Sequence, residues 1–175
     1  MRRASLLVAA ALGVLPAGCG EDEREADPPP PRRGLIVSQQ SIDTLALGMS
    51  GDEVRRLYGR PDEVKRLAES EAGTPIHDWL YRDKGMTAEL RRTGAAKFEL
   101  KGLFTTSAAQ RTEDGAGVGS SEEEVTRAVD DLDCGPGDPG ERWCTLDGDV
   151  IGTPQTIFVM RTGKVVEVRV LETFP

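Results

Sequence analysis

Histidine, the side chain that most readily moves protons near neutral pH, occurs once in this chain, as His77. A general base or activated nucleophile needs a second reactive group within hydrogen-bond reach. His77 stands beside the start of an expected strand, and no Ser or Cys motif accompanies it. We therefore expect a polar or capping role for His77, and the sequence predicts no catalytic residue and no enzyme.

The acidic and glycine-rich stretches lack the spacing of a metal or cofactor site. Residues 130–133 and Asp147-Gly148-Asp149 do not follow the Asp-x-Asp-x-Asp-Gly pattern that wraps a calcium ion. Glycines alternate over residues 115–119, but no lysine completes a phosphate-binding loop, so a flexible connector is expected. The run Glu122-Glu123-Glu124 suits the start of a helix. We expect no metal site and no cofactor.

The first nineteen residues have the composition of an export signal. Arg2 and Arg3 give a basic start, residues 4–15 form an apolar run, and Leu-Pro-Ala-Gly-Cys closes it at Cys19. The apolar run is shorter than the roughly 20 residues that a membrane-spanning helix needs.

The closing tripeptide Ala17-Gly18-Cys19 resembles the lipobox of bacterial lipoproteins, although Pro16 stands where that family usually has a branched apolar residue. The resemblance implies that residues 1–18 are a cleaved signal peptide and that Cys19 carries the lipid. An ordinary secretory signal with an incidental cysteine is the alternative. Acyl chains on Cys19 would anchor the protein to the extracytoplasmic face of the cell membrane.

If Cys19 is the lipid site, Cys134 and Cys144 remain as a pair in an oxidising compartment. Residues 135–140 between them are rich in Gly and Pro, so a turn can bring the two sulfurs together. A metal site or a redox dithiol fits less well, because no His lies nearby and the spacing is not Cys-x-x-Cys. We expect a structural disulfide, which would stabilise the fold by about 2.8 kcal/mol in the chain-entropy model.

Residues 19–34 are acidic and proline-rich, which predicts an extended tether between the anchor and a single domain at 35–175. The whole chain has 30 acidic and 22 basic residues and a net charge of −8. Removal of Arg2 and Arg3 with the signal would make it −10. This balance argues against binding to nucleic acid and against electrostatic docking on anionic lipid.

The domain contains a weak internal repeat, with units at about 42–105 and 117–175. The pattern Gly-x-Ser-x-x-Glu-Val occurs at 48–54 and again at 119–125, and Arg-Thr-Gly occurs at 92–94 and 161–163. Each Ser-x-x-Glu is a capping box that predicts a short helix, at about 50–58 and 121–132.

Alternating and β-branched patterns predict strands after each helix, at 79–82, 87–92, 96–105, 156–160 and 164–171. The segment 62–72 fits a helix or a strand. Trp79 is expected in the core and Trp143 against the disulfide. The expected fold class is α+β, an antiparallel sheet of about five strands with two short helices on one face.

The first unit resembles the SmpA/OmlA (BamE-like) lipoprotein family and, more widely, the β-lactamase-inhibitor-protein-like fold. The residues that carry the resemblance are Ile42, Leu47-Gly48-Met49-Ser50, Glu53-Val54, Leu57, Gly59, Pro61, Trp79 and Tyr81. The Cys134–Cys144 loop and the second unit depart from the single-unit members of this family.

The resemblance implies non-enzymatic binding of an unidentified protein partner in the cell envelope, by a module that contacts the bilayer through its acyl chains. An anchored hydrolase acting on envelope material and a secreted inhibitor-like protein are the alternatives.

Overall fold

The computed structural model describes residues 31–67, 74–94, 97–147 and 152–172, and its main feature is one long antiparallel sheet. The strands of this sheet lie in the order β4-β5-β6-β7-β11-β10-β9-β8. Their bounds are Glu63–Leu67 (β4), Ile76–Tyr81 (β5), Met86–Thr93 (β6), Lys97–Thr105 (β7), Asp133–Pro136 (β8), Arg142–Leu146 (β9), Pro154–Arg161 (β10) and Lys164–Glu172 (β11). A short second sheet contains Ile36–Val37 (β1), Ser41–Ile42 (β2) and Leu45–Ala46 (β3).

The expected α+β fold with a sheet of about five strands is wrong. The described chain is mostly β, with eight strands in the long sheet and three in the short one. Its α-helices are Gly51–Tyr58 (α1) and Glu122–Ala128 (α2), beside a 3-10 turn at Arg82–Lys84. The additional strands of the long sheet are β4, in the segment that fitted helix or strand, and β8 and β9, which form the hairpin that contains the cysteines.

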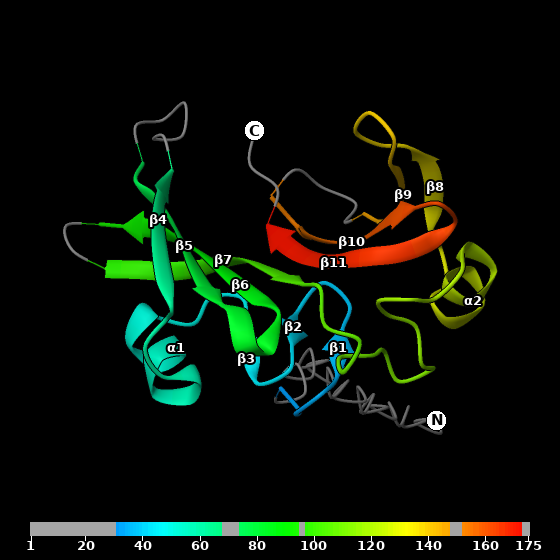
Figure 1. The fold of residues 1–175 in the computed structure, drawn as a ribbon. Helices are drawn as coiled ribbons and strands as arrows, with labels where there is room; N and C mark the ends of the chain where they lie inside the picture. Colours follow the sequence, from blue (N-terminus) through cyan, green and yellow to red (C-terminus); the bar gives the residue numbers. More distant parts are fainter. Residues whose placement is uncertain (1–30, 68–73, 95–96, 148–151, 173–175) are drawn as a thin grey trace, which may run out of the picture.

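The eight strands divide into two successive halves that meet in the middle of the sheet. α1 precedes β4–β7, and α2 precedes β8–β11. β7 pairs with β11, and Leu103 lies opposite Val170 in this pairing. The halves therefore share one continuous sheet (Figure 1).

Both helices begin at the predicted capping boxes. The Ser50 hydroxyl accepts a hydrogen bond from the N–H of Glu53, and the Glu53 carboxylate accepts one from the N–H of Ser50. Ser121 and Glu124 repeat this arrangement at α2. Each box satisfies backbone donors that the first helical turn leaves free. α2 ends earlier than predicted, because Val129 already has an extended backbone.

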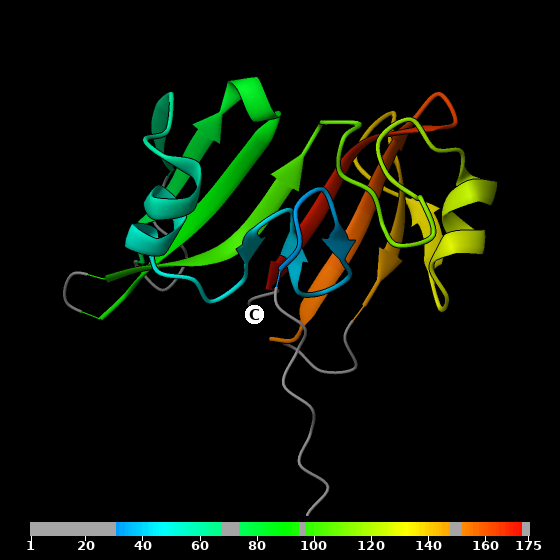
Figure 2. The same cartoon turned by 90° about the horizontal axis from the view of Figure 1, so that it is seen from below.

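The two faces of the long sheet have different surroundings. α1, the short sheet and α2 all lie against one face, as two views of the molecule show (Figure 1, Figure 2). The edge strands β4 and β8 rise on either side of the central strands, so the sheet curves away from the covered face (Figure 1). We call the opposite face the concave face.

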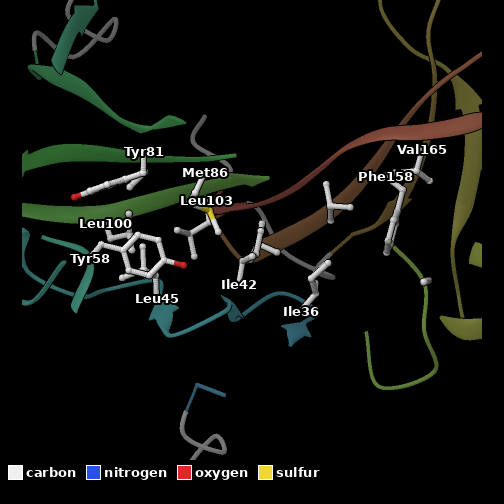
Figure 3. Packing of buried hydrophobic residues seen from close by; sticks show 14 of the residues in the cluster. Ile36, Ile42, Leu45, Tyr58, Tyr81, Met86, Leu100, Leu103, Phe158 and Val165 are labelled. Atoms are coloured by element: carbon white, nitrogen blue, oxygen red, sulfur yellow. The ribbon is translucent and has the colours of Figure 1, made fainter. Parts of the chain in front are cut away.

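The core fills the space between the covered face of the sheet and the elements packed on it (Figure 3). Ile42 and Leu45 of the short sheet and Leu103 and Phe158 of the long sheet are completely buried. Trp79 is also in the core, as predicted, with 4% of its surface exposed. Within the described ranges, no helix is long and apolar enough to cross a membrane.

Candidate binding face

Side chains on the concave face alternate in sequence with core residues, because successive side chains of a strand point to opposite sides. On β6, Ala88 and Leu90 are completely buried in the core, so Glu89 and Arg91 point to the concave face. The same alternation, interrupted on β7 by a β-bulge at Lys101, places further residues there from the neighbouring strands: Asp78, Glu99, Phe104, Trp143, Ile157, Val159, Glu167 and Arg169.

Cations of the central strands are paired with carboxylates on this face. Arg91 Nε lies 2.9 Å from a carboxylate oxygen of Glu89, and Arg169 donates to Glu167 in the same way. Lys101 Nζ forms an ion pair with Glu99. It also lies 2.9 Å from a carboxylate oxygen of Glu172, at the end of β11. Burial lowers the pKa of Lys101, but hydrogen bonds to the two carboxylates outweigh burial and raise it overall. These pairs hold their side chains in fixed positions.

Trp143 of β9 lies on the concave face and not against the disulfide, which corrects the expectation from sequence. Its neighbour Cys144 points into the core, so the indole points the other way. The indole N–H donates to Glu141 at 2.9 Å, and the guanidinium of Arg169 lies 5.4 Å from the ring centroid. The hydrogen bond from Trp143 and the ion pair with Arg161 lower the pKa of Glu141.

A hollow of about 260 Å³ lies where the turn between β5 and β6 meets the end of β7. Leu80, Thr87, Phe104 and Glu167 contribute to its lining. The Phe104 ring lies directly over Gly102, where an added Cβ would come within 3.0 Å of it. The glycine therefore lets the aromatic ring lie flat along the sheet.

Asp78 is a candidate that the sequence analysis missed. It lies opposite Lys65 of β4 and Glu89 of β6. Its Oδ1 atom is buried and has no hydrogen-bond partner among the described residues. Burial and the charge of Glu89 raise the pKa of Asp78, and Lys65 partly offsets them. Only the pairing of three strands brings these groups together, so no local sequence signal could reveal them.

The predicted disulfide is present. Cys134 and Cys144 are joined by an S–S bond of 2.03 Å that links β8 to β9. Glu122 lies close enough to both sulfurs to complete a three-residue group of metal-binding type. Because both sulfurs are used in the disulfide, neither is a thiolate that could bind a metal ion. Cys19, the predicted lipid site, lies outside the described residues.

His77 packs against an aromatic ring and not against a carboxylate. Its imidazole stacks on Phe98, with ring centroids 4.4 Å apart. Burial, followed by the charges of Arg66 and Arg92, lowers the pKa of His77. The described contacts of His77 thus contain neither a nucleophile nor an orienting acid.

The glycine-rich connector at residues 115–119 is organised around one side chain. The Arg111 guanidinium donates to the carbonyl oxygens of Gly115 and Val118 and to the hydroxyl of Ser120. The sequence predicted a connector here but gave no indication of this arginine's role. The Arg111 guanidinium therefore stabilises the backbone of the connector.

No protein-family model and no curated protein matches the chain. Two solved structures are similar to it: a cysteine-rich secretory protein from Staphylococcus aureus, at 14% identity and a TM-score of 0.42, and an extracellular protein containing an SCP domain from Bacillus anthracis, at 11% identity and a TM-score of 0.44. Each match covers 72% of this chain, which spans 44% of the matched chain. At TM-scores below 0.5, neither match assigns a fold family or a function.

Proposed function

We propose that the chain is a membrane-anchored, extracytoplasmic lipoprotein that binds a protein partner through the concave face of its sheet and catalyses no reaction. The anchor rests on the lipobox-like Ala17-Gly18-Cys19 after a basic and apolar leader. The acidic, proline-rich segment that follows would hold the domain away from the bilayer.

The observation that carries the binding proposal is the concave face, on which no described helix or strand lies (Figure 1, Figure 2). It spans eight strands, a width of about 34 Å at the usual strand spacing. A face of this size can supply the roughly 800 Å² that each partner contributes to a stable interface.

The chemistry of the face also suits a protein partner. Phe104 and Trp143 are partly exposed aromatic side chains, the type that most often anchors protein interfaces. The ion pairs around Lys101 and Arg169 already fix long side chains, so less conformational entropy is lost when a partner binds.

Crosslinking in native envelopes, followed by capture of the full chain and mass spectrometry, tests this proposal. The Phe104→Arg variant should lose the captured partner, because a charge would replace the aromatic ring in the hollow. Leu57→Arg is the matched control: Leu57 is 45% exposed on α1, on the other side of the sheet. Equal capture by wild type and Phe104→Arg would refute binding through the concave face.

Metabolic labelling with a fatty-acid analogue tests the anchor separately. The wild-type protein should be labelled and should fractionate with membranes, whereas Cys19→Ala should lose both properties. Equal labelling of the two proteins would refute lipidation at Cys19.

The anchored-hydrolase alternative rests on Asp78 and Glu89, neighbouring carboxyl groups of which one has a raised pKa. A general acid requires a raised pKa of this kind. Release of soluble fragments from purified cell wall by the full chain, and loss of that release in Asp78→Asn, would favour hydrolysis over binding alone.

A further inference from the structure

A second surface lies on the opposite side of the sheet, where the start of α1 meets β5 and the beginning of β7. It is a cavity of about 380 Å³, which we call the cationic cleft. Its lining residues are Ser50, Gly51, Asp52, Arg55, Trp79, Lys97 and Phe98. His77 and Arg92 flank it through their contacts with Phe98.

Aromatic rings and cations alternate along this cleft. The Arg55 guanidinium lies 4.5 Å from the centroid of the Trp79 ring, and that of Arg92 lies 5.6 Å from the Phe98 centroid. His77 also stacks on Phe98. Cations held over aromatic faces are positioned without being neutralised.

The cations of the cleft are not paired as those of the concave face are. Among the described residues, neither Lys97 nor Arg92 has a carboxylate within ion-pair distance, and Arg55 contacts the fully exposed Asp52 only at 4.0 Å. The lowered pKa of His77, caused by burial and then by Arg66 and Arg92, agrees with a locally positive potential.

The distribution of charge along the sequence agrees with a positive potential at the cleft. Residues 35–105 contain 11 basic and 11 acidic side chains, whereas residues 106–175 contain 6 and 14. The net charge of −8 therefore lies entirely in the second half. The cleft lies in the half that does not share this excess of carboxylates.

We propose that the cationic cleft binds an acidic, extended segment of a partner polypeptide. Carboxylates of that segment would pair with Arg92 and Lys97, and an apolar side chain between them would enter the cavity against Trp79 and Phe98. An arginine can bind a carboxylate through two parallel hydrogen bonds, which makes such a pair directional.

The neighbouring edge of the sheet favours a polypeptide over a lipid surface. β4 is the last strand of the sheet, and its Val64 lies opposite Trp79 on the side of the cleft, with 44% of its surface exposed. β4 thus offers free backbone donors and acceptors with which an extended chain can pair. A planar bilayer can neither pair with a strand edge nor enter a recessed cavity.

The probe for this proposal is the capped heptapeptide Glu-Phe-Glu-Val-Glu-Phe-Glu, titrated into the full chain in detergent. In a Trp143→Phe background, Trp79 is the remaining tryptophan and reports on the cleft. We expect the peptide to change the Trp79 fluorescence in a saturable way. A peptide with Gln in place of each Glu should bind at least tenfold more weakly. The Arg92→Gln/Lys97→Gln variant should also bind the original peptide at least tenfold more weakly.

Arg127→Gln/Lys164→Gln removes the same charge from the second half and is the matched control, with unchanged binding expected. No saturable signal, equal binding of the Gln peptide, or unchanged binding by the Arg92/Lys97 variant would overturn the proposal. Sedimentation with phosphatidylglycerol vesicles that depends on Arg92 and Lys97 would assign the cleft to a membrane and would also overturn it. Phe104→Arg should leave peptide binding intact, so failure of this proposal and failure of concave-face binding are separable.

Discussion

The packing of Trp143 gives a sharp test of the concave face, because two nearby glycines differ in the space around them. A Cβ added at Gly137 would lie 2.4 Å from the indole ring of Trp143, whereas one added at Gly135 would meet nothing within 4 Å. Neither glycine has a positive φ, so alanine is compatible with both backbones. Gly137→Ala must therefore displace the indole, and Gly135→Ala is its matched control.

The expected sizes follow from packing and from chain entropy. Forcing a ring out of a filled position costs roughly 1–3 kcal/mol. Replacing an unhindered glycine by alanine stabilises by about 0.5 kcal/mol, because the unfolded chain loses freedom. The two variants should differ by about 2 kcal/mol, which is a shift of about 1 M in the urea midpoint.

Urea unfolding and acrylamide quenching measure the two consequences. Gly137→Ala should unfold at lower urea and show a more accessible tryptophan, because the indole leaves Arg169 and Glu141. Gly135→Ala should match or exceed the wild type in stability, with unchanged quenching. Equal midpoints and equal quenching in the two variants would refute the packing described for Trp143.

Three further results are expected. Replacing both Cys134 and Cys144 by alanine should cost about 2.8 kcal/mol of unfolding free energy in urea, because the loop between them is no longer closed; an unchanged midpoint would contradict this. Leu103→Ala, at the seam between the halves, should cost roughly 2–5 kcal/mol with a single unfolding transition, and two separate transitions would show that the halves fold independently. The NMR titration of His77 should give a pKa below 6.5 that rises towards 6.5 in Arg92→Gln, and no change in that variant would exclude the influence of Arg92. Because the unfolded chain binds this proton more readily, His77 should also make the fold less stable as pH falls below 6.5 towards the folded pKa.

The parts of the fold that depend on local sequence could be predicted. Both capping boxes lie within four residues of chain, so Ser50 and Ser121 marked the helix starts directly. β11 alternates clearly and is joined to the apolar strand β10 by a tight turn. β8 could not be recognised, because Asp-Cys-Gly-Pro contains turn-forming residues and becomes a strand only through its pairing with β9.

The binding surfaces depend on contacts that are distant in sequence, which is why residue spacing did not reveal them. Lys101 meets Glu172 across 71 positions, and Asp78 is buried only because β4 and β6 flank β5. The disulfide was the exception. Its two cysteines lie on adjacent strands of one hairpin, so the turn-rich loop between them was sufficient to predict it.

Basic side chains near the two helix starts differ in their pairing with carboxylates. Beside α2, Lys164 approaches Glu124 at 3.9 Å and Arg127 contacts Glu123 at 2.7 Å. Beside α1, Lys97 lines the cleft, and no described carboxylate neutralises it. Since the helix start and the following strands are alike in the two halves, the backbone does not account for this difference. It arises from the surface side chains, as expected if carboxylates of a bound partner pair with the cations of the cleft. The concave face, on the other side of the sheet, would then stay free to bind a second partner.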